Sequence, residues 1–185
     1  LVFADADERA VKRGTRAVFN NTGQSCNAPT RMLVERSIYD DAVEIARQTA
    51  EETKVASGHE PGRHIGPVVS QQQWDKVQGL IQQGLDEGAR LVAGGLGRPE
   101  GLNRGYYVRP TVFADVSNDM TIAREEIFGP VLSIIPFETE EDAVRIANDT
   151  EYGLTNYVQS SDAARRVRLA KRLRSGMVEM NGKSR

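Results

Sequence analysis

The stretch VLSIIPFETEEDAVRIAN, residues 131–148, contains the pattern that decides the fold class. Residues 131–135 form an apolar run short enough for a strand that is buried on both faces. Thr139 and the three acidic residues after it predict the start of a helix that runs to Asn148, because carboxylates in a first turn favour the helix dipole. An apolar strand followed closely by a helix is typical of a parallel sheet covered by helices.

The same alternation extends in both directions along the chain. Further strands are expected at residues 31–35, 90–93, 106–113, 155–159 and 177–181, and further helices at 7–20, 37–56, 70–88 and 162–173. Asp7 and Ser70 are placed to cap two of these helices, and Gly88 is placed to end one. The pattern predicts an α/β fold with a mostly parallel sheet flanked by helices on both faces.

Length and composition indicate one folded domain over residues 1–185. Hydrophobic residues make up 39% of the chain and charged residues 27%, a balance close to that of ordinary globular proteins and far from that of disordered ones. Lys and Arg number 24 against 26 for Asp and Glu, so the net charge of -2 provides no general attraction to nucleic acid.

The sequence lacks the patterns of a membrane span, a signal peptide and a metal site. No apolar run approaches the roughly 18 residues that a membrane span needs, and the first ten residues are acidic where a signal peptide is basic. A cytoplasmic protein without a membrane partner is therefore expected. The single cysteine cannot form an internal disulfide, and His59 and His64 do not form a zinc pattern, so no metal site is expected.

Both ends of the chain read as cut. Residues 1–3 resemble a strand already under way, and residues 181–185 end without a closing element. We expect the natural protein to continue in both directions.

The single cysteine, Cys26, stands where a predicted helix has ended and a strand is about to begin. A loop in that position can expose a nucleophile, and nearby backbone N–H groups can favour the thiolate. Taken alone, however, a single cysteine is more often a small buried hydrophobic residue.

Two motifs change that interpretation. The stretch FNNTGQSC, residues 19–26, resembles the active-site cysteine signature of the aldehyde dehydrogenase superfamily, and EEIFGPV, residues 125–131, resembles the second signature of that family. Two signatures in the right order about a hundred residues apart rarely arise by chance. Further similar segments lie at residues 65–67, 105–111, 147–154 and 176–181, so that the resemblance covers essentially the whole chain.

The resemblance implies an NAD(P)-dependent aldehyde dehydrogenase catalytic domain. In that family a cysteine, here Cys26, attacks an aldehyde to form a thiohemiacetal, hydride passes to NAD or NADP, and water hydrolyses the thioester. Glu126 and Phe128 match positions that contact the nicotinamide ribose and ring. Gln73 and Lys76 match positions that can approach the adenosine ribose, although solvated polar residues are also expected on their helix.

Several parts of the family's machinery are not in these 185 residues. The resemblance places the general-base glutamate in a Glu-Leu-Gly-Gly-Lys signature before Leu1, and it also places the dinucleotide-binding domain and a C-terminal tail outside the chain. The isolated chain is therefore expected to be nearly inactive and to expose an apolar docking face. A homo-oligomer is expected for the complete protein, whereas the aldehyde and the choice between NAD and NADP are left open.

Three alternatives to a dehydrogenase remain at this point. The cations at residues 165–174 suggest a nucleic-acid-binding helix, although apolar residues on the same helix favour a solvated face. The chain could also be a structural or regulatory remnant that keeps the fold without the activity. A different thiol enzyme would need Cys26 to pair with His59 or His64, which both lie in a loop rich in Gly and Pro.

Overall fold

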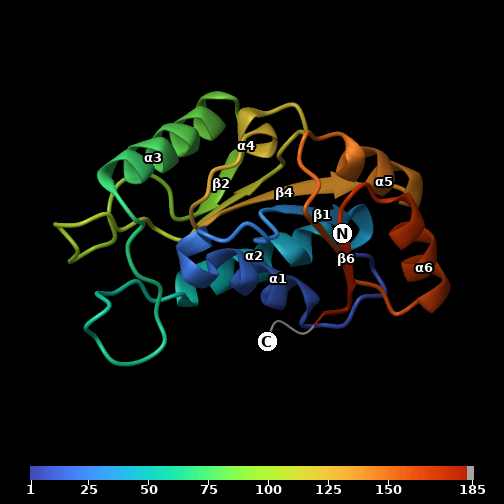
Figure 1. Ribbon diagram of the computed structural model, residues 1–185, viewed down its shortest axis with the longest axis horizontal. Helices are drawn as coiled ribbons and strands as arrows, with labels where there is room; N and C mark the ends of the chain where they lie inside the picture. The colour runs from blue at the N-terminus through green and yellow to red at the C-terminus, as the bar shows by residue number, and fades with distance from the viewer. Residues whose placement is uncertain (183–185) are drawn as a thin grey trace.

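A computed structural model describes residues 1–182 and contains a four-stranded sheet at its centre (Figure 1). The strands are β1 (Arg31–Glu35), β2 (Arg90–Ala93), β3 (Thr111–Ala114) and β4 (Val131–Phe137), in the order β1-β4-β3-β2. Strand β4 is parallel to both β1 and β3, and β2 is antiparallel to β3. The predicted α/β fold with a mostly parallel sheet is confirmed.

A second, two-stranded sheet continues this arrangement. Strands β5 (Thr155–Val158) and β6 (Met177–Met180) are parallel to each other. Residues 1–3 lie between the two sheets, since Val2 forms parallel bridges to Val34 and to Gln159. The backbone N–H of Val2 donates to the carbonyl of Leu33 at 2.8 Å. The opening residues thus connect the two sheets.

Helices cover both faces of the central sheet (Figure 1). Helices α1 (Ala10–Phe19) and α2 (Tyr39–Glu52) pack on one face, and α3 (Gln71–Asp86), α4 (Thr121–Arg124), α5 (Glu140–Asn148) and α6 (Ala163–Arg172) lie on the other side. Two short 3₁₀ helices, η1 (Asn20–Gly23) and η2 (Arg36–Ile38), lead into the loop after α1 and into α2.

Two of the predicted helix starts have the expected side-chain cap, and a third, at Asp7, does not. The hydroxyl of Ser70 accepts a hydrogen bond from the N–H of Gln73, and the hydroxyl of Thr139 accepts one from the N–H of Asp142. Asp7 does not cap α1, which begins three residues later. Its carboxylate binds the guanidinium of Arg13 instead, at 2.7 and 3.0 Å. The same carboxylate accepts a hydrogen bond from the N–H of Arg9 at 3.0 Å, so it stabilises the turn before α1 rather than the first turn of the helix.

Other predicted boundaries were wrong for reasons of backbone pairing. The helix expected over residues 37–56 ends at Glu52, because Thr53 turns to an extended conformation and Val55 pairs with Ile65. The strand expected over 106–113 begins only at Thr111, and α4 was not predicted. A four-residue helix has too few turns to show a periodic pattern.

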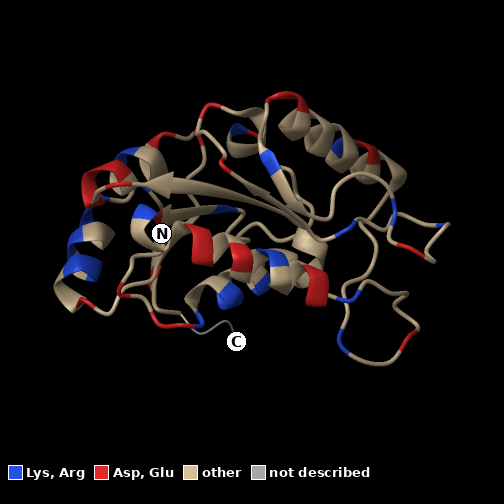
Figure 2. Cartoon of the chain, turned by 180° about the vertical axis from the view of Figure 1, so that it is seen from behind, with Lys and Arg blue, Asp and Glu red and all other residues tan. Residues whose placement is uncertain are grey.

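Three of the five cations of α6, Arg165, Arg168 and Arg172, pair with acidic residues. Arg168 contacts Glu140 at 2.8 Å, and Arg172 contacts Glu141. Figure 2 shows the blue segments of α6 beside the red first turn of α5. Because these charges are matched within the fold, α6 is better explained as a partner of α5 than as a nucleic-acid-binding helix.

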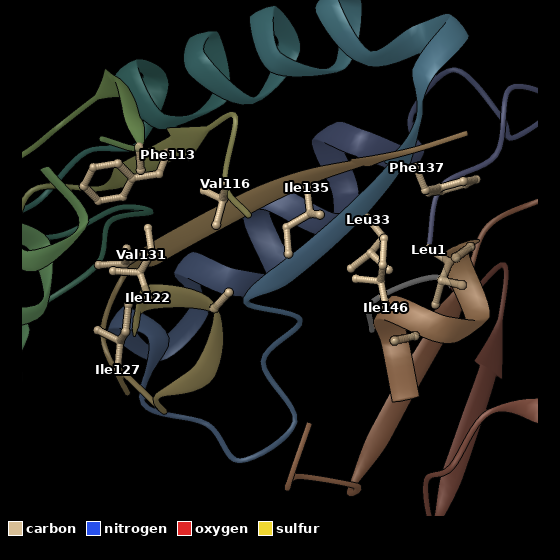
Figure 3. Close-up of a cluster of buried hydrophobic side chains, with 14 of the residues drawn as sticks. Leu1, Leu33, Phe113, Val116, Ile122, Ile127, Val131, Ile135, Phe137 and Ile146 are labelled. Atoms are coloured by element: carbon tan, nitrogen blue, oxygen red, sulfur yellow. The ribbon is translucent and has the colours of Figure 1, made fainter. Parts of the chain in front are cut away.

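The alternation of β4 divides the core into two layers. Leu132 and Ile134 point into a cluster with α1 and α2, whereas Val131 and Ile135 point into a cluster with α3, α4 and α5. Figure 3 shows the second cluster, in which Phe113 of β3 is fully buried. In a strand that is covered on both faces, successive side chains point into opposite layers of the core, so apolar residues are needed on both faces of the strand.

Asp5 ties the first residues to the start of α6. Its carboxylate accepts hydrogen bonds from the hydroxyls of Ser160 and Ser161 at 2.9 Å and from the N–H of Asp162 at 3.0 Å, and it contacts Arg165 at 2.9 Å. Burial raises the pKa of Asp5, but these hydrogen bonds and the charge of Arg165 outweigh burial and hold the pKa below its usual value.

The stability that Asp5 contributes is expected to disappear in acid. A carboxyl whose pKa is depressed by folding stabilises the protein above its unfolded pKa of about 3.9, and this contribution is lost as the pH falls through the lower folded value. Asp5→Asn should reduce the free energy of unfolding by about 1–3 kcal/mol at pH 7. The measurement is urea unfolding at pH 7 and at pH 3, and the difference between parent and variant should be smaller at pH 3. Glu100→Gln, an exposed substitution, serves as the control, and an equal loss for D5N at both pH values would contradict the assignment.

Candidate active site

Cys26 is exposed on the loop between η1 and β1. It lines a broad open cleft of about 1400 Å³ together with Asn27, Glu126, Phe128 and Tyr157. The two sequence motifs therefore meet at one cleft although they lie about a hundred residues apart. A thiol, a carboxylate and an aromatic ring thus line the same cleft.

Gly23 is the residue that lets the two motif loops touch. Its φ is +73°, and a Cβ built on it would lie 2.0 Å from the carbonyl oxygen of Gly129 and 2.8 Å from the nitrogen of Pro130. No residue with a side chain fits at that distance. The cysteine loop is thus packed directly on the backbone of the second motif.

The backbone before Cys26 is strained and held by specific hydrogen bonds. Asn21 and Thr22 have φ values of 51° and 58°, a left-handed region that costs non-glycine residues about 1–3 kcal/mol each. The Asn21 amide donates to the carbonyl of Gln24 at 2.9 Å, and the Thr22 hydroxyl donates to the carbonyl of Gly66 at 3.0 Å. The Gln24 side chain accepts from the N–H of Val69 at 2.9 Å. Such strain is a frequent feature of functional loops.

Glu126 and Phe128 form a second part of the cleft lining, called the rim below. The N–H of Glu126 donates to the hydroxyl of Tyr152 at 3.2 Å, whereas among residues 1–182 its carboxylate has no hydrogen-bond partner. Phe128 has a φ of 55° and is half-buried. An exposed carboxylate beside an aromatic ring suits a ligand that combines hydroxyl groups with a flat ring.

Gln73 and Lys76 lie on α3 behind this rim and outside the cleft lining. The Gln73 amide donates to the carbonyls of Ile127 and Phe128 at 3.0 and 2.9 Å, and the Lys76 ammonium donates to the carbonyl of Glu126 at 2.6 Å. Both side chains therefore support the backbone of the rim. Contact of either with a cofactor stays a prediction.

Sequence reasoning missed the two tyrosines of the cleft. Tyr152 accepts from the N–H of Glu126, and Tyr157 donates to the carbonyl of Asn27 at 2.8 Å. Tyr157 lies in a predicted strand and looks like an ordinary half-buried residue, and nothing in the sequence indicates which loop the hydroxyl of either tyrosine reaches.

Metal and membrane features are absent from the part of the chain that the structure describes. Residues 1–182 contain no group of three or more His, Cys, Asp or Glu side chains arranged to hold a metal ion. No helix within that range is long and apolar enough to cross a membrane. His64 lines the same cleft as Cys26, but among these residues no hydrogen bond joins Cys26 to either histidine, so the Cys–His pair of the alternative is not formed.

Comparisons with known proteins agree with the motifs. A sequence model described as the aldehyde dehydrogenase family matches residues 1–185. A 3-succinoylsemialdehyde-pyridine dehydrogenase from a Pseudomonas species is 50% identical over 183 residues, which are 98% of this chain and 38% of that protein. The chain thus spans well under half the length of this curated relative.

Solved structures show the same fold. An aldehyde dehydrogenase from Bartonella henselae superposes with a TM-score of 0.98 at 64% identity, covering 100% of this chain and 39% of that one. A cysteine-to-alanine mutant of aldehyde dehydrogenase C from Pseudomonas syringae, in complex with NAD+ and octanal, superposes with a TM-score of 0.96 at 45% identity and covers 100% and 38%.

Proposed function

Since the chain belongs to the aldehyde dehydrogenase family, we propose that it is the nucleophile-bearing part of an NAD(P)-dependent enzyme that oxidises an aldehyde to a carboxylic acid. The observation that carries the proposal is the meeting of Cys26 with the Glu126 and Phe128 rim at one cleft. The relatives solved with NAD+ support the choice of cofactor.

Cys26 performs the covalent chemistry in this proposal. Its thiolate adds to the aldehyde carbonyl carbon, so that a carbon–sulfur bond forms and the carbonyl oxygen takes the negative charge. The backbone N–H of Cys26, which has no acceptor among the described residues, is left to hold that oxyanion. Oxidation of the adduct leaves an acyl group on the sulfur, and water then releases the acid and restores the thiol.

The rim residues fit the cofactor that this oxidation needs. The exposed carboxylate of Glu126 can accept hydrogen bonds from two ribose hydroxyls, and the ring of Phe128 can pack beside a nicotinamide. A bound nicotinamide dinucleotide supplies the acceptor for the hydride. Gln73 and Lys76 hold this rim from behind and are proposed to act on the cofactor mainly through it.

We also propose that the isolated chain turns over very slowly. The chain covers 38% of the curated relative, and a general base and a dinucleotide-binding domain are expected in the remainder. A general base contributes typically 10²- to 10⁴-fold to a rate. The isolated chain should therefore bind thiol reagents at Cys26 without appreciable turnover.

The test compares Cys26→Ala with the parent in the isolated chain and in the full-length enzyme. With a short aliphatic aldehyde and NAD+, the full-length parent should form NADH, and the substitution should reduce the rate by about 10⁴-fold or more. The isolated chain should form almost none, while iodoacetamide should still modify Cys26, as followed by mass spectrometry. The urea-unfolded chain provides the control for full thiol access.

Two results would count against the proposal. NADH formation by a full-length Cys26→Ala enzyme would remove Cys26 from the mechanism. Rapid, Cys26-dependent turnover by the isolated chain would show that no part outside these residues is needed.

A further inference from the structure

Tyr157 contacts the nucleophile loop from a distant part of the chain. Its hydroxyl donates a hydrogen bond to the backbone carbonyl of Asn27, the residue after Cys26, at 2.8 Å. Tyr157, Asn27 and Cys26 line the same cleft. A side chain of β5 therefore reaches the loop at the position next to the thiol.

The strand that carries Tyr157 is held on both sides. Tyr157 pairs with Glu179 of β6, and its own backbone carbonyl accepts a hydrogen bond from the nitrogen of Leu1 at 2.7 Å. Phe3 also donates to the carbonyl of Gln159 at 3.1 Å, just past the end of β5. The hydroxyl is thus presented from a rigid element, as precise positioning requires.

The loop segment 26–29 has few attachments of its own. The N–H of Ala28 donates to the carbonyl of Ser25 at 3.0 Å, and the N–H of Thr30 donates to the carbonyl of Ala28 at 2.9 Å. Both are contacts within the loop. Among residues 1–182, the bond from Tyr157 is the one hydrogen bond that ties this segment to the rest of the protein.

The hydroxyl of Tyr157 stays protonated, and so remains a hydrogen-bond donor, over the pH range in which a cysteine acts as a nucleophile. Burial, followed by the negative charges of Glu179 and of the Cys26 thiolate, raises the pKa of Tyr157 above its usual value. A protonated hydroxyl can donate to a carbonyl, whereas a phenolate cannot.

We propose that Tyr157 is a positioning residue for the nucleophile, whose hydroxyl holds the Asn27 carbonyl and thereby fixes the Cys26 thiol in the cleft. This inference rests on the proposed role of Cys26 as the nucleophile. Tyr157 does not touch the reacting atoms in this proposal and acts through the loop. Small displacements of a reacting group can cost about 10²-fold in rate, and water can partly replace a lost hydroxyl at the exposed Asn27, so an intermediate effect is expected.

The test is Tyr157→Phe in the full-length enzyme, which removes only the hydroxyl. We expect kcat to fall about tenfold with the KM for NAD+ unchanged, because the Glu126 and Phe128 rim is untouched. Hydrogen–deuterium exchange of a peptide covering residues 24–30 should become faster. The urea midpoint should stay near that of the parent, which separates loss of positioning from loss of folding.

Two variants complete the design. Tyr106→Phe is the matched control, because among residues 1–182 the Tyr106 side chain makes no hydrogen bond, and it should leave kcat and exchange unchanged. The activity of Cys26→Ala tests the proposed function, in which Cys26 is the nucleophile. An unchanged kcat and unchanged exchange in Y157F, with Cys26→Ala inactive, would overturn the positioning role alone, whereas an active Cys26→Ala enzyme would overturn the proposed function itself.

Discussion

Gly23→Ala is expected to lower the free energy of unfolding by about 3–5 kcal/mol. The added methyl group would lie 2.0 Å from the carbonyl oxygen of Gly129 and 2.2 Å from its carbonyl carbon, so backbone rather than a flexible side chain would have to move. The positive φ of Gly23 adds about 1–2 kcal/mol of strain for an alanine. Urea unfolding followed by circular dichroism measures the loss.

Gly79→Ala provides a matched control with the opposite expected sign. Gly79 lies in the exposed interior of α3, and nothing lies within 4 Å of a Cβ built there. Because alanine reduces the entropy of the unfolded chain and favours a helix, this change should stabilise the protein by up to about 1 kcal/mol. A loss at Gly23 no larger than about 1 kcal/mol would show that the two motif loops can separate at little cost.

Phe113→Ala is expected to lower the free energy of unfolding by about 3–5 kcal/mol through the cavity that it leaves. Phe113 is 0% exposed, and its ring reaches α3, where a Cβ on Gly84 would lie 3.2 Å from the ring tip. Ile122 of α4 also lies beside Gly84, so the Phe113 ring fills space between β3, α3 and α4. Urea unfolding again gives the measurement.

Leu91→Ala is the control for this core substitution. Leu91 lies opposite Phe113 in the register of β2 and β3, but it is 36% exposed at the sheet edge. Its truncation should cost about 1 kcal/mol, because less apolar surface returns to water. Equal losses for the two variants would mean that the core around Phe113 collapses to fill the cavity.

The sequence predicted those features whose causes lie close together along the chain. The apolar run that became β4 and the acidic first turn of α5 predicted both elements, because each depends on neighbours within a few residues. The caps at Ser70 and Thr139 depend on an N–H three residues away and were found where expected. The motif around Cys26, which is continuous in the sequence, likewise identified the family.

Predictions that depended on distant partners were less accurate. Asp7 was predicted to cap a helix. In the structure its carboxylate accepts from the guanidinium of Arg13, which also donates to the side chain of Gln159. The helix after η2 ended early because Val55 found a strand partner ten residues on. Gln73 and Lys76 read as surface residues that could reach a cofactor, and only the structure shows that their side chains bind the carbonyls of the rim.

The sequence by itself determined the fold class and the family, and it predicted Cys26 as the nucleophile, because periodicity, caps and motifs are local properties of the chain. The tertiary structure alone decided how the site is held together. Gly23 meets Gly129, and Tyr157 meets Asn27, across more than a hundred residues. Such contacts arise only when packing of the two sheets and their helices brings the loops to one cleft, and no local pattern specifies which distant groups will meet there.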